Sequence, residues 1–396
     1  MTHVVVPQAL IDRRSPVRLI VSGGGGGDHT FPAVAVVRAA RTAFRHHGLE
    51  LQPFWVGAER DVEAKVAAEE GVPFTAIPTG GTRRARNRLC RVSAAVGRAP
   101  MAVTEAVNLV RGIRPDAVLC TGGYASVPVG LAARFCHRPL LVHEQGVRVG
   151  LANRITMRGA SRVALGTEPT MDLLPERLRG RAVVTGNPLR PGLAGGDAGS
   201  APARLRWDGW TPSLPTVYVT GGAIGARRLN ELVTAILPEL LRYANVFHQA
   251  GAELLGPVLA AAEALPPELR PRYLARGFVG EELADLLALA DVAVSRGGCR
   301  TVGELTALGK PSVLVLPARA PGDERRRHAE HLAAHGAARV LAGDEATPAR
   351  LVRELALLLT DPLRRSEMSA MARRLGRPGA AAALTNEVLA LCAAAP

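Results

Sequence analysis

Lysine and aromatic residues are scarce in this 396-residue chain. Lysine occurs only as Lys65 and Lys310, so arginine carries nearly all of the formal net charge of +14. Aromatic residues make up 4% of the chain, although 47% of it is hydrophobic. Nucleic-acid-binding surfaces interleave aromatic and basic side chains, and that pattern is absent, so we expect no nucleic-acid partner. A basic protein still attracts other polyanions, such as phosphorylated substrates or an anionic membrane surface.

Cysteine is also scarce, and its spacing excludes the usual cysteine-based sites. The cysteines are isolated in the sequence and odd in number, and none forms a Cys-x-x-Cys pair: Cys90, Cys120, Cys136, Cys299 and Cys392. We therefore expect reduced thiols, no disulfide framework and no zinc site. No apolar run approaches the roughly 20 residues that cross a bilayer, and the N-terminus lacks a signal-peptide pattern. We expect a cytoplasmic protein, either free or peripheral on the inner face of the cell membrane.

The first half of the chain alternates short apolar runs with helical patterns. Such alternation predicts a parallel sheet with helices on both faces. The predicted strands are 17–23, 51–57, 74–78, 115–123 and 139–145. The helical patterns are 31–48, 60–71, 83–112 and 127–137.

The same alternation restarts after a small, polar stretch. Residues 192–212 are expected to be an interdomain linker. They separate an N-terminal domain, 1–191, from a C-terminal domain, 213–373. The strands predicted in the second half are 215–222, 244–251, 272–279, 291–298 and 311–317. The fold class is therefore α/β, with two Rossmann-like, doubly wound parallel sheets.

Glycines or polar clusters follow several predicted strands. Ligands of open parallel sheets bind at the carboxyl ends of the strands. Two such sheets facing a cleft suit an enzyme with two substrates, one for each domain. The loops concerned are 23–29, 121–126, 143–146, 221–226 and 295–304.

The first of these loops contains five consecutive glycines before Asp28 and His29. When the dinucleotide fingerprint G-x-G-x-x-G starts at Gly23, its third glycine falls on Asp28. A carboxylate there would repel a pyrophosphate, and no Walker A sequence is present, so a dehydrogenase is disfavoured. The positive end of the following helix favours a neutral imidazole on His29. His29 is therefore a candidate general base, or a residue that merely caps the turn.

The remaining loops suggest ligand contacts and also permit plainer roles. The polar stretches 121–128 and 143–145 suit a polyhydroxylated ligand or ordinary surface turns. The helix that starts within 220–230 could hold a diphosphate at its N-terminus. Glu304 could accept hydrogen bonds from a ribose diol or stabilise the start of its helix. The basic segment 83–107 could lie on an anionic membrane or form a solvated helix.

Taken in order, these and neighbouring stretches resemble the MurG family, glycosyltransferases that move GlcNAc from UDP-GlcNAc to lipid I. GGGGDHTFPA (24–33) is similar to the family's GGTGGHxxPA, and HEQGVRVGLANR (143–154) is similar to HEQNxxxGxxNR. The other stretches that carry the resemblance are 122–128, 184–190, 221–230, 248–251, 295–304 and 323–338. Together they span most of the chain.

The resemblance implies a GT-B fold and an inverting transfer without a cofactor or an essential metal. The donor, a UDP-sugar, is implied to bind the C-terminal domain, and the hydroxyl-bearing acceptor mainly the N-terminal one. The final helix, within 374–396, is implied to cross back to the first domain. His29 is the implied base or acceptor-site residue. Other residues implied on the acceptor side are Gly25, Gly26, Gly27, Asp28, Gly122, Tyr124, Ser126, His143, Glu144 and Gly146.

On the donor side, the resemblance implies that the Val279 backbone contacts uracil and Glu304 the ribose. Arg190 and the 221–226 loop are implied to hold the diphosphate. The full donor set is Arg190, Gly222, Ala223, Gly225, Val279, Cys299, Arg300, Thr301, Val302, Glu304 and Arg325.

Several positions depart from the family pattern, and a changed hydrogen-bonding group changes substrate choice. One alternative is therefore a paralogue that uses a different nucleotide sugar on a small-molecule or natural-product acceptor. Another is a non-catalytic binding protein with a GT-B fold. The departures are Asp28, Gly146, Ala223, Ile224, Arg325 and His328.

Overall fold

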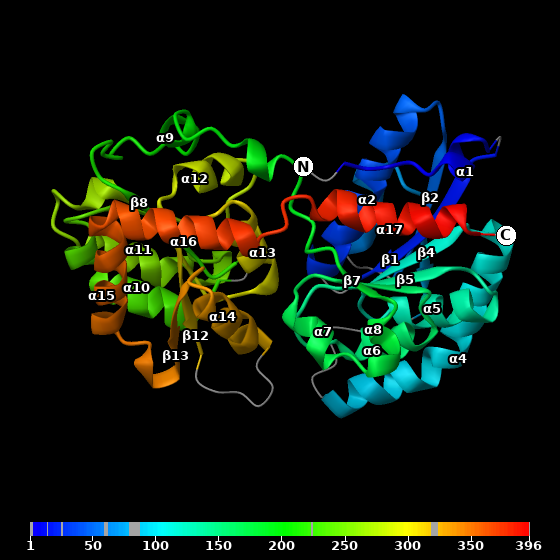
Figure 1. Cartoon of the computed structure of the whole chain (residues 1–396). Helices are drawn as coiled ribbons and strands as arrows, with labels where there is room; N and C mark the ends of the chain where they lie inside the picture. Colours follow the sequence, from blue (N-terminus) through cyan, green and yellow to red (C-terminus); the bar gives the residue numbers. More distant parts are fainter. Residues whose placement is uncertain are drawn as a thin grey trace. The chain divides into compact units, whose positions relative to one another are not determined.

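The computed structural model describes residues 3–13, 15–24, 27–58, 62–78, 88–222, 225–317 and 324–395, with backbone only at 27–28, 62, 88–99 and 324–325. The chain divides into two compact units (Figure 1). The first comprises Met1–Leu189 together with Pro378–Pro396, and the second comprises Arg190–Arg377. In the described part of the chain, no helix is long and apolar enough to cross a membrane.

The first unit is built on a parallel sheet of seven strands in the order β3-β2-β1-β4-β5-β6-β7. The order runs outward in both directions from β1 and β4, so the topological switch point lies between these neighbours. The strands are β1 Val17–Gly23, β2 Leu51–Ala58, β3 Phe74–Ile77, β4 Ala117–Gly122, β5 Leu140–Glu144, β6 Arg162–Leu165 and β7 Ala182–Val184.

Helices cover both faces of this sheet because its strands are apolar on both sides. Leu19 packs into a cluster with α2 and α17, whereas its neighbour Ile20 packs with α4 and α5 on the opposite face. This alternation follows from the two-residue period of a strand. The helices are α1 Gln8–Ile11, α2 Gly27–His46, α3 Val62–Glu69, α4 Arg88–Ile113, α5 Ser126–Phe135, α6 Leu151–Thr156, α7 Pro169–Leu173, α8 Glu176–Arg179 and α17 Ala380–Ala393.

The second unit repeats the plan with six parallel strands in the order β10-β9-β8-β11-β12-β13. Its switch point lies between β8 and β11. The strands are β8 Thr216–Thr220, β9 Asn245–Gln249, β10 Tyr273–Arg276, β11 Val292–Ser295, β12 Ser312–Leu316 and β13 Arg339–Ala342. The helices are α9 Ala201–Arg204, α10 Arg227–Leu240, α11 Leu255–Glu263, α12 Leu283–Leu289, α13 Cys299–Ala307, α14 Glu324–Ala334, α15 Pro348–Thr360 and α16 Pro362–Leu375.

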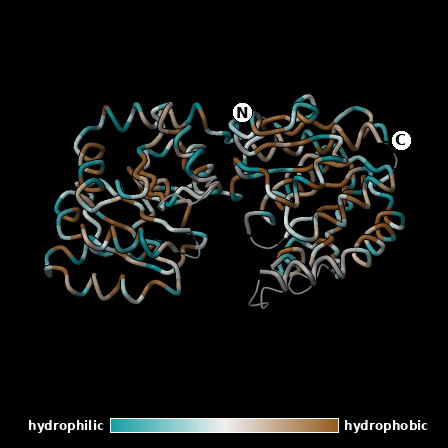
Figure 2. Tube along the Cα trace, turned by 90° about the horizontal axis from the view of Figure 1, so that it is seen from below, coloured by the Kyte–Doolittle hydropathy of each residue, from teal (hydrophilic) through white to brown (hydrophobic). Residues whose placement is uncertain are grey.

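The predicted α/β class with two doubly wound parallel sheets is confirmed. In each unit hydrophobic and hydrophilic residues alternate along the trace (Figure 2). Each predicted strand is present, although the observed ends differ by up to a few residues. The strands β6, β7 and β13 were not predicted.

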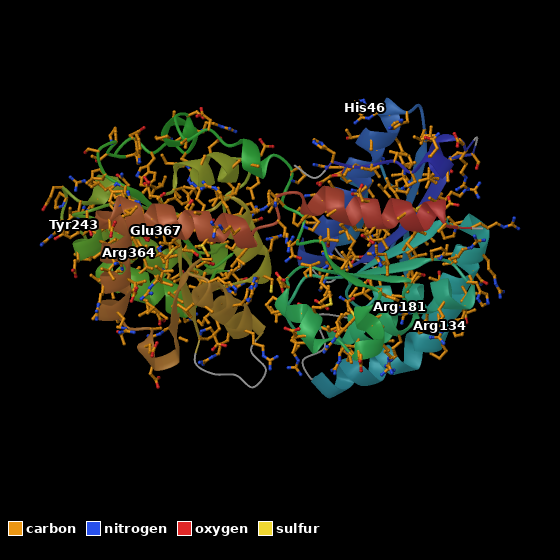
Figure 3. All side chains as sticks on the ribbon, viewed as in Figure 1. His46, Arg134, Arg181, Tyr243, Arg364 and Glu367 are labelled. Carbon is orange, nitrogen blue, oxygen red and sulfur yellow. The ribbon has the colours of Figure 1, made fainter. Side chains whose placement is uncertain are left out.

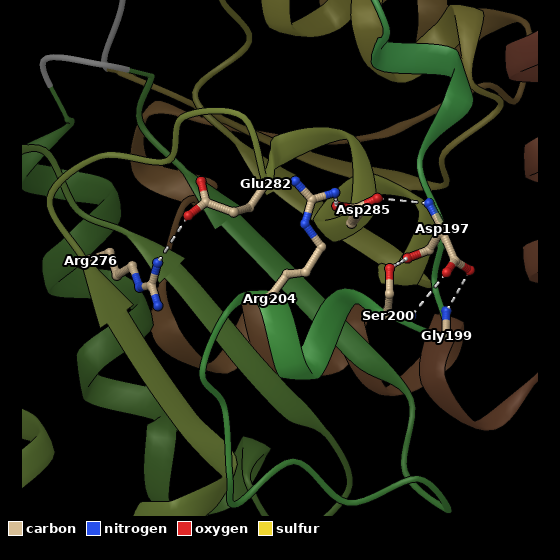
Figure 4. A network of polar contacts seen from close by, with 7 residues as sticks. All are labelled: Asp197, Gly199, Ser200, Arg204, Arg276, Glu282 and Asp285. Atoms are coloured by element: carbon tan, nitrogen blue, oxygen red, sulfur yellow. Dashed lines mark hydrogen bonds and ion pairs between the residues drawn. The ribbon is translucent and has the colours of Figure 1, made fainter.

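The segment 192–212 differs from the expectation of a linker. It lies within the second unit, and Leu193, Leu205 and Trp207 are buried there. The carboxylate of Asp285 in α12 accepts hydrogen bonds from the Asp197 backbone N–H, at 2.8 Å, and from the Arg204 guanidinium (Figure 4). A few large apolar side chains and one buried carboxylate therefore hold this polar stretch on the unit.

Candidate functional site

In the first unit, the loops after β1 and β4 meet at the switch point. The backbone N–H of Gly24 donates to the carbonyl of Gly122 at 3.1 Å. Gly123 has φ +88°, and a Cβ there would lie 2.0 Å from the Gly24 carbonyl oxygen. Gly122 has φ +107°, and a Cβ there would lie 2.7 Å from Nδ1 of His29. Both positions therefore require glycine, because the loop and the imidazole approach the backbone too closely for a side chain.

His29 lies in the first turn of α2, where its imidazole has one defined tautomer. Nδ1 is 2.9 Å from the carbonyl oxygen of Thr121 and 3.1 Å from Oε1 of Gln145. Both partners are acceptors, so Nδ1 carries the proton and donates. Nε2 is then the basic nitrogen, and it has no hydrogen-bond partner among the described residues. This is the arrangement that a general base needs.

Gln145 fixes this arrangement, although the sequence did not single it out as a site residue. Its Nε2 lies 2.7 Å from the Thr121 carbonyl and 3.2 Å from Nδ1 of His143, which are both acceptors. These contacts place the amide nitrogen on that side and leave Oε1 to face His29. His143 in turn donates from Nε2 to the carbonyl of Gly186 at 3.2 Å.

His143 is fully buried, and burial lowers its pKa to about 4. It is therefore a neutral imidazole whose two nitrogens are both hydrogen-bonded within the fold. Because His143 has no exposed surface, it supports the hydrogen bonds around His29 and does not face a ligand directly.

Two other predicted acceptor-side residues, Glu144 and Ser126, also use their polar atoms within the protein. Glu144 accepts from the backbone N–H groups of Gly146 and Gly150, at 3.0 and 2.9 Å. Ser126 donates to the carbonyl groups of Ser22 and Gly122, at 3.0 and 2.8 Å, respectively. These side chains hold the loops in place.

By contrast, the side chain of Tyr124 is 62% exposed beside the site, so it can contact a ligand.

For several other predicted acceptor-side and donor-side residues, the structure gives no side-chain position. Gly25, Gly26 and Ala223 lie outside the described residues, and only the backbone is described at Gly27, Asp28 and Arg325. Most of the basic segment 83–107 falls under the same restriction, because side chains are described only from residue 100 onward.

The second unit has a pocket beside its own switch point. Its residues come from β8, β9, α12, α13 and the loops that follow strands. Arg190, Gly222, Arg300, Thr301 and Glu304 were predicted donor-site residues, and the structure brings them together here. The pocket is also lined by Tyr218, Thr220, Gln249, Phe278, Leu283, Leu287 and Leu305, which the sequence did not identify.

Arg190 and Glu304 form an ion pair in this pocket. Nε of Arg190 lies 2.9 Å from Oε1 of Glu304, and Nη2 lies 3.4 Å from Oε2. The carboxylate side chain is 5% exposed and the guanidinium side chain 25% exposed. The two predicted ligand-binding charges therefore contact one another through both carboxylate oxygens.

The helix α13 begins at Cys299, immediately after Gly297 and Gly298, and its first residues line the pocket. The dipole of the helix makes this end suitable for an anion. Val279 was predicted to contact uracil through its backbone and Val302 to line the donor helix entry, and each is 1% exposed. Val302 packs with Leu314 and Leu332, so these valines can contact a ligand only through backbone atoms.

The loop after β8 also requires glycine near the pocket. Gly225 has φ +80°, and a Cβ there would lie 2.0 Å from the Ala250 carbonyl oxygen.

In the described part of the chain, no group of three or more His, Cys, Asp or Glu side chains is placed to hold a metal ion.

Comparison with known proteins identifies the family. Residues 19–165 match the glycosyltransferase family 28 N-terminal domain, and residues 216–384 match the C-terminal domain of that family. The chain belongs to glycosyltransferase family 28, in its MurG branch. A MurG-type enzyme of Alkalilimnicola ehrlichii is 37% identical over 380 residues, which cover 93% of this chain and 97% of that protein. Its relative from Lachnospira eligens is 32% identical over 345 residues, which cover 87% and 91%.

Both enzymes are named UDP-N-acetylglucosamine--N-acetylmuramyl-(pentapeptide) pyrophosphoryl-undecaprenol N-acetylglucosamine transferase. The crystal structure of Acinetobacter baumannii MurG matches with a TM-score of 0.73 at 26% identity, covering 94% of this chain and 99% of that chain. The predicted MurG resemblance, GT-B fold and hexosyltransferase class are thus confirmed.

Proposed function

We propose that this MurG-family enzyme transfers GlcNAc from UDP-GlcNAc to a hydroxyl of a lipid-linked N-acetylmuramyl-pentapeptide diphosphate. The observation that carries the proposal is the similarity to transferases named for this reaction, over more than nine-tenths of their length. The first unit supplies a base with a defined tautomer, and the second supplies a pocket suited to a nucleoside diphosphate.

In this proposal, His29 acts on the acceptor. Its Nε2 accepts the hydroxyl proton while the acceptor oxygen attacks the anomeric carbon of the sugar. The bond from that carbon to the UDP oxygen breaks, and UDP leaves with the electron pair. Attack opposite to the leaving group inverts the configuration at the anomeric carbon.

The second unit holds the nucleotide. Phe278 is 57% exposed beside the pocket and offers an aromatic face to a base. Glu304 is placed to accept hydrogen bonds from ribose hydroxyls. Arg190, Arg300 and the start of α13 supply positive charge for the diphosphate, so we propose that UDP leaves without an essential metal.

Transfer of labelled GlcNAc from UDP-GlcNAc to the lipid-linked acceptor tests the proposal. The wild type should turn over, and His29→Ala should lose at least 100-fold in kcat. His46→Ala is the matched control, because exposed His46 ends the same helix, α2, roughly 25 Å away at 1.5 Å per residue (Figure 3). A wild type that binds no uridine nucleotide would refute the proposal.

Gly146 gives a reason to test a second acceptor class. In the MurG pattern an Asn occupies this position. Here the residue has only backbone groups, and both are already paired: its N–H donates to Glu144 at 3.0 Å and its carbonyl accepts from Thr170 at 2.9 Å. A site without that amide has fewer groups for sugar hydroxyls or phosphates. Gly146→Asn should improve transfer to the lipid-linked acceptor if that loss reflects a changed acceptor.

We also propose that the enzyme associates peripherally with an anionic membrane, where a lipid-linked acceptor resides. The proposal is supported by the abundance of arginine in 83–107 and by Met101 of α4, which is 64% exposed. Flotation with anionic liposomes tests it. Replacing Arg83, Arg84 and Arg86 with Ala should reduce binding, and unchanged binding would refute the idea.

A further inference from the structure

Two buried polar residues, Tyr218 and Gln249, lie side by side in the donor pocket without a role in the mechanism above. Tyr218 is in β8 and Gln249 ends the neighbouring strand β9. They are 3% and 5% exposed, and both line the pocket. The Tyr218 hydroxyl is 2.7 Å from Oε1 of Gln249. We call them the Tyr218–Gln249 pair.

The direction of this hydrogen bond is defined. Burial raises the pKa of Tyr218, so its hydroxyl keeps its proton at any physiological pH. An amide oxygen can only accept, so the hydroxyl donates to Oε1 of Gln249. Because Oε1 is occupied, the orientation of the carboxamide is fixed and Nε2 is on its opposite side.

Nε2 of Gln249 has no hydrogen-bond partner within the described ranges. This donor is not sealed within the protein, so it is accessible from the pocket that Gln249 lines. A ligand acceptor in the pocket would complete the pair. The groups around it include Arg190, Phe278 and Glu304, which suit a ligand with an aromatic base and oxygen atoms.

We propose that Gln249 is a specificity-determining residue that donates a hydrogen bond from Nε2 to an oxygen of the bound nucleoside diphosphate. Tyr218 is a positioning residue, since it acts by fixing the carboxamide. The inference rests on the proposed use of a uridine nucleotide. The acceptor oxygen belongs either to the nucleoside or to the diphosphate, and both sources share the same chemistry.

Calorimetric titration of the full-length protein with UDP tests the proposal. Gln249→Met keeps the length of the side chain and removes the donor, and it should weaken UDP binding about tenfold. Gln249→Glu replaces the donor with an acceptor and should weaken it further. Gln52→Met, on β2 of the first unit, makes the same change away from the pocket and should bind as the wild type does.

Titration with uridine shows whether the acceptor oxygen belongs to the nucleoside or to the diphosphate. A tenfold loss for uridine and UDP alike places the acceptor on the nucleoside, and a loss for UDP alone places it on the diphosphate. Either result supports the proposal. If folded Gln249→Met binds UDP with wild-type affinity, the role proposed for Gln249 is overturned. The proposed transferase function would remain, because it fails only if the wild-type protein does not bind UDP or does not turn over.

Tyr218→Phe tests positioning separately from folding. The variant should weaken UDP binding severalfold in the wild-type background and have no further effect when Gln249 is already Met. A merely structural tyrosine would weaken binding equally in both backgrounds, which would overturn the role assigned to Tyr218. The melting temperature of each variant shows whether it is folded at the temperature of titration.

Discussion

The guanidinium of Arg190 contacts both carboxylate oxygens of Glu304, Oε1 at 2.9 Å and Oε2 at 3.4 Å. The carboxylate has about four lone-pair directions and the guanidinium has five N–H groups. The pair therefore leaves acceptors on Glu304 and donors on Arg190 that can still bind a nucleotide. The roles expected for the two residues, ribose and diphosphate recognition, are compatible with their contact.

We predict that Glu304→Gln weakens UDP binding at least tenfold. The substitution removes charge-assisted hydrogen bonds, which contribute about 1.5–3 kcal/mol each. Glu354→Gln is a matched control, because Glu354 is also buried and paired with an arginine, Arg339 at 2.7 Å, outside the pocket. Calorimetry should show normal UDP binding for this control. Equal losses in both variants would mean that Glu304 only stabilises the fold.

We predict that His29→Asn keeps the loop in place and loses catalysis. The Asn amide can still donate to the Thr121 carbonyl, whereas no basic nitrogen replaces Nε2. kcat should fall by about 10² to 10⁴, with UDP affinity unchanged. Steady-state kinetics with both substrates varied would reveal this. If kcat is retained, His29 is a scaffold residue.

We predict that Gly122→Ala displaces the imidazole of His29. The new Cβ would lie 2.7 Å from Nδ1, and φ is +107°. kcat should fall at least tenfold, because small displacements of a base are costly. Gly48→Ala separates backbone strain from this clash, since Gly48 has φ +67° and open space around its Cα. The control should lose about 1 kcal/mol of stability and no activity.

We predict that acid destabilises the second unit through His248. Its Nδ1 is 2.8 Å from the Tyr273 hydroxyl and its Nε2 is 3.1 Å from Oδ1 of Asn230. Burial lowers its pKa from 6.5 to about 4, so the folded state binds a proton less readily than the unfolded state. The stability linked to this group is complete above pH 6.5 and is lost as the pH falls towards 4.

Urea unfolding at pH 7 and pH 5 measures this effect. The free energy of unfolding should fall by about 2 kcal/mol between these pH values on account of His248. His248→Gln should be less stable at pH 7 and should lack this part of the decrease. His335→Gln changes an exposed histidine of the same unit and should keep the wild-type decrease. Because His143 and His328 are also buried with a pKa of about 4, part of the decrease should remain in His248→Gln. A decrease as large as that of the wild type would contradict the assignment.

We predict that chelation of divalent metals leaves turnover unchanged. The charge of the departing UDP would be stabilised by the α13 N-terminus and arginines, as proposed above. Activity measured with and without EDTA, and again after addition of Mg²⁺, decides the question. A loss with EDTA that Mg²⁺ restores would require a metal in the reaction.

The sequence predicted the sheets well because many strands are short, mainly apolar runs followed closely by glycine. The strands β6, β7 and β13 escaped prediction because each offers only three or four residues beside an arginine. β7 and β13 are also edge strands, and their burial is incomplete. Short edge strands gain their pairing from the neighbouring strand, so their own sequence carries little signal.

The pocket of the second unit was predicted only in part, for a different reason. Glycines and charged residues that follow strands stand out in a sequence, and Arg190 and Glu304 were found in this way. Tyr218 and Gln249 lie inside the strand patterns, where an apolar run does not show which side chain reaches a pocket. Gln145 was likewise visible only as one of three consecutive polar residues.

The return of α17 to the first unit makes the second unit an insertion within the first. Leu384, Val388, Leu389 and Cys392 of α17 belong to the same core as Leu19 of β1. A stop codon after residue 377 would therefore leave the second unit whole and uncover the core of the unit that begins the chain. Truncation from the C-terminus should damage the first unit before the second.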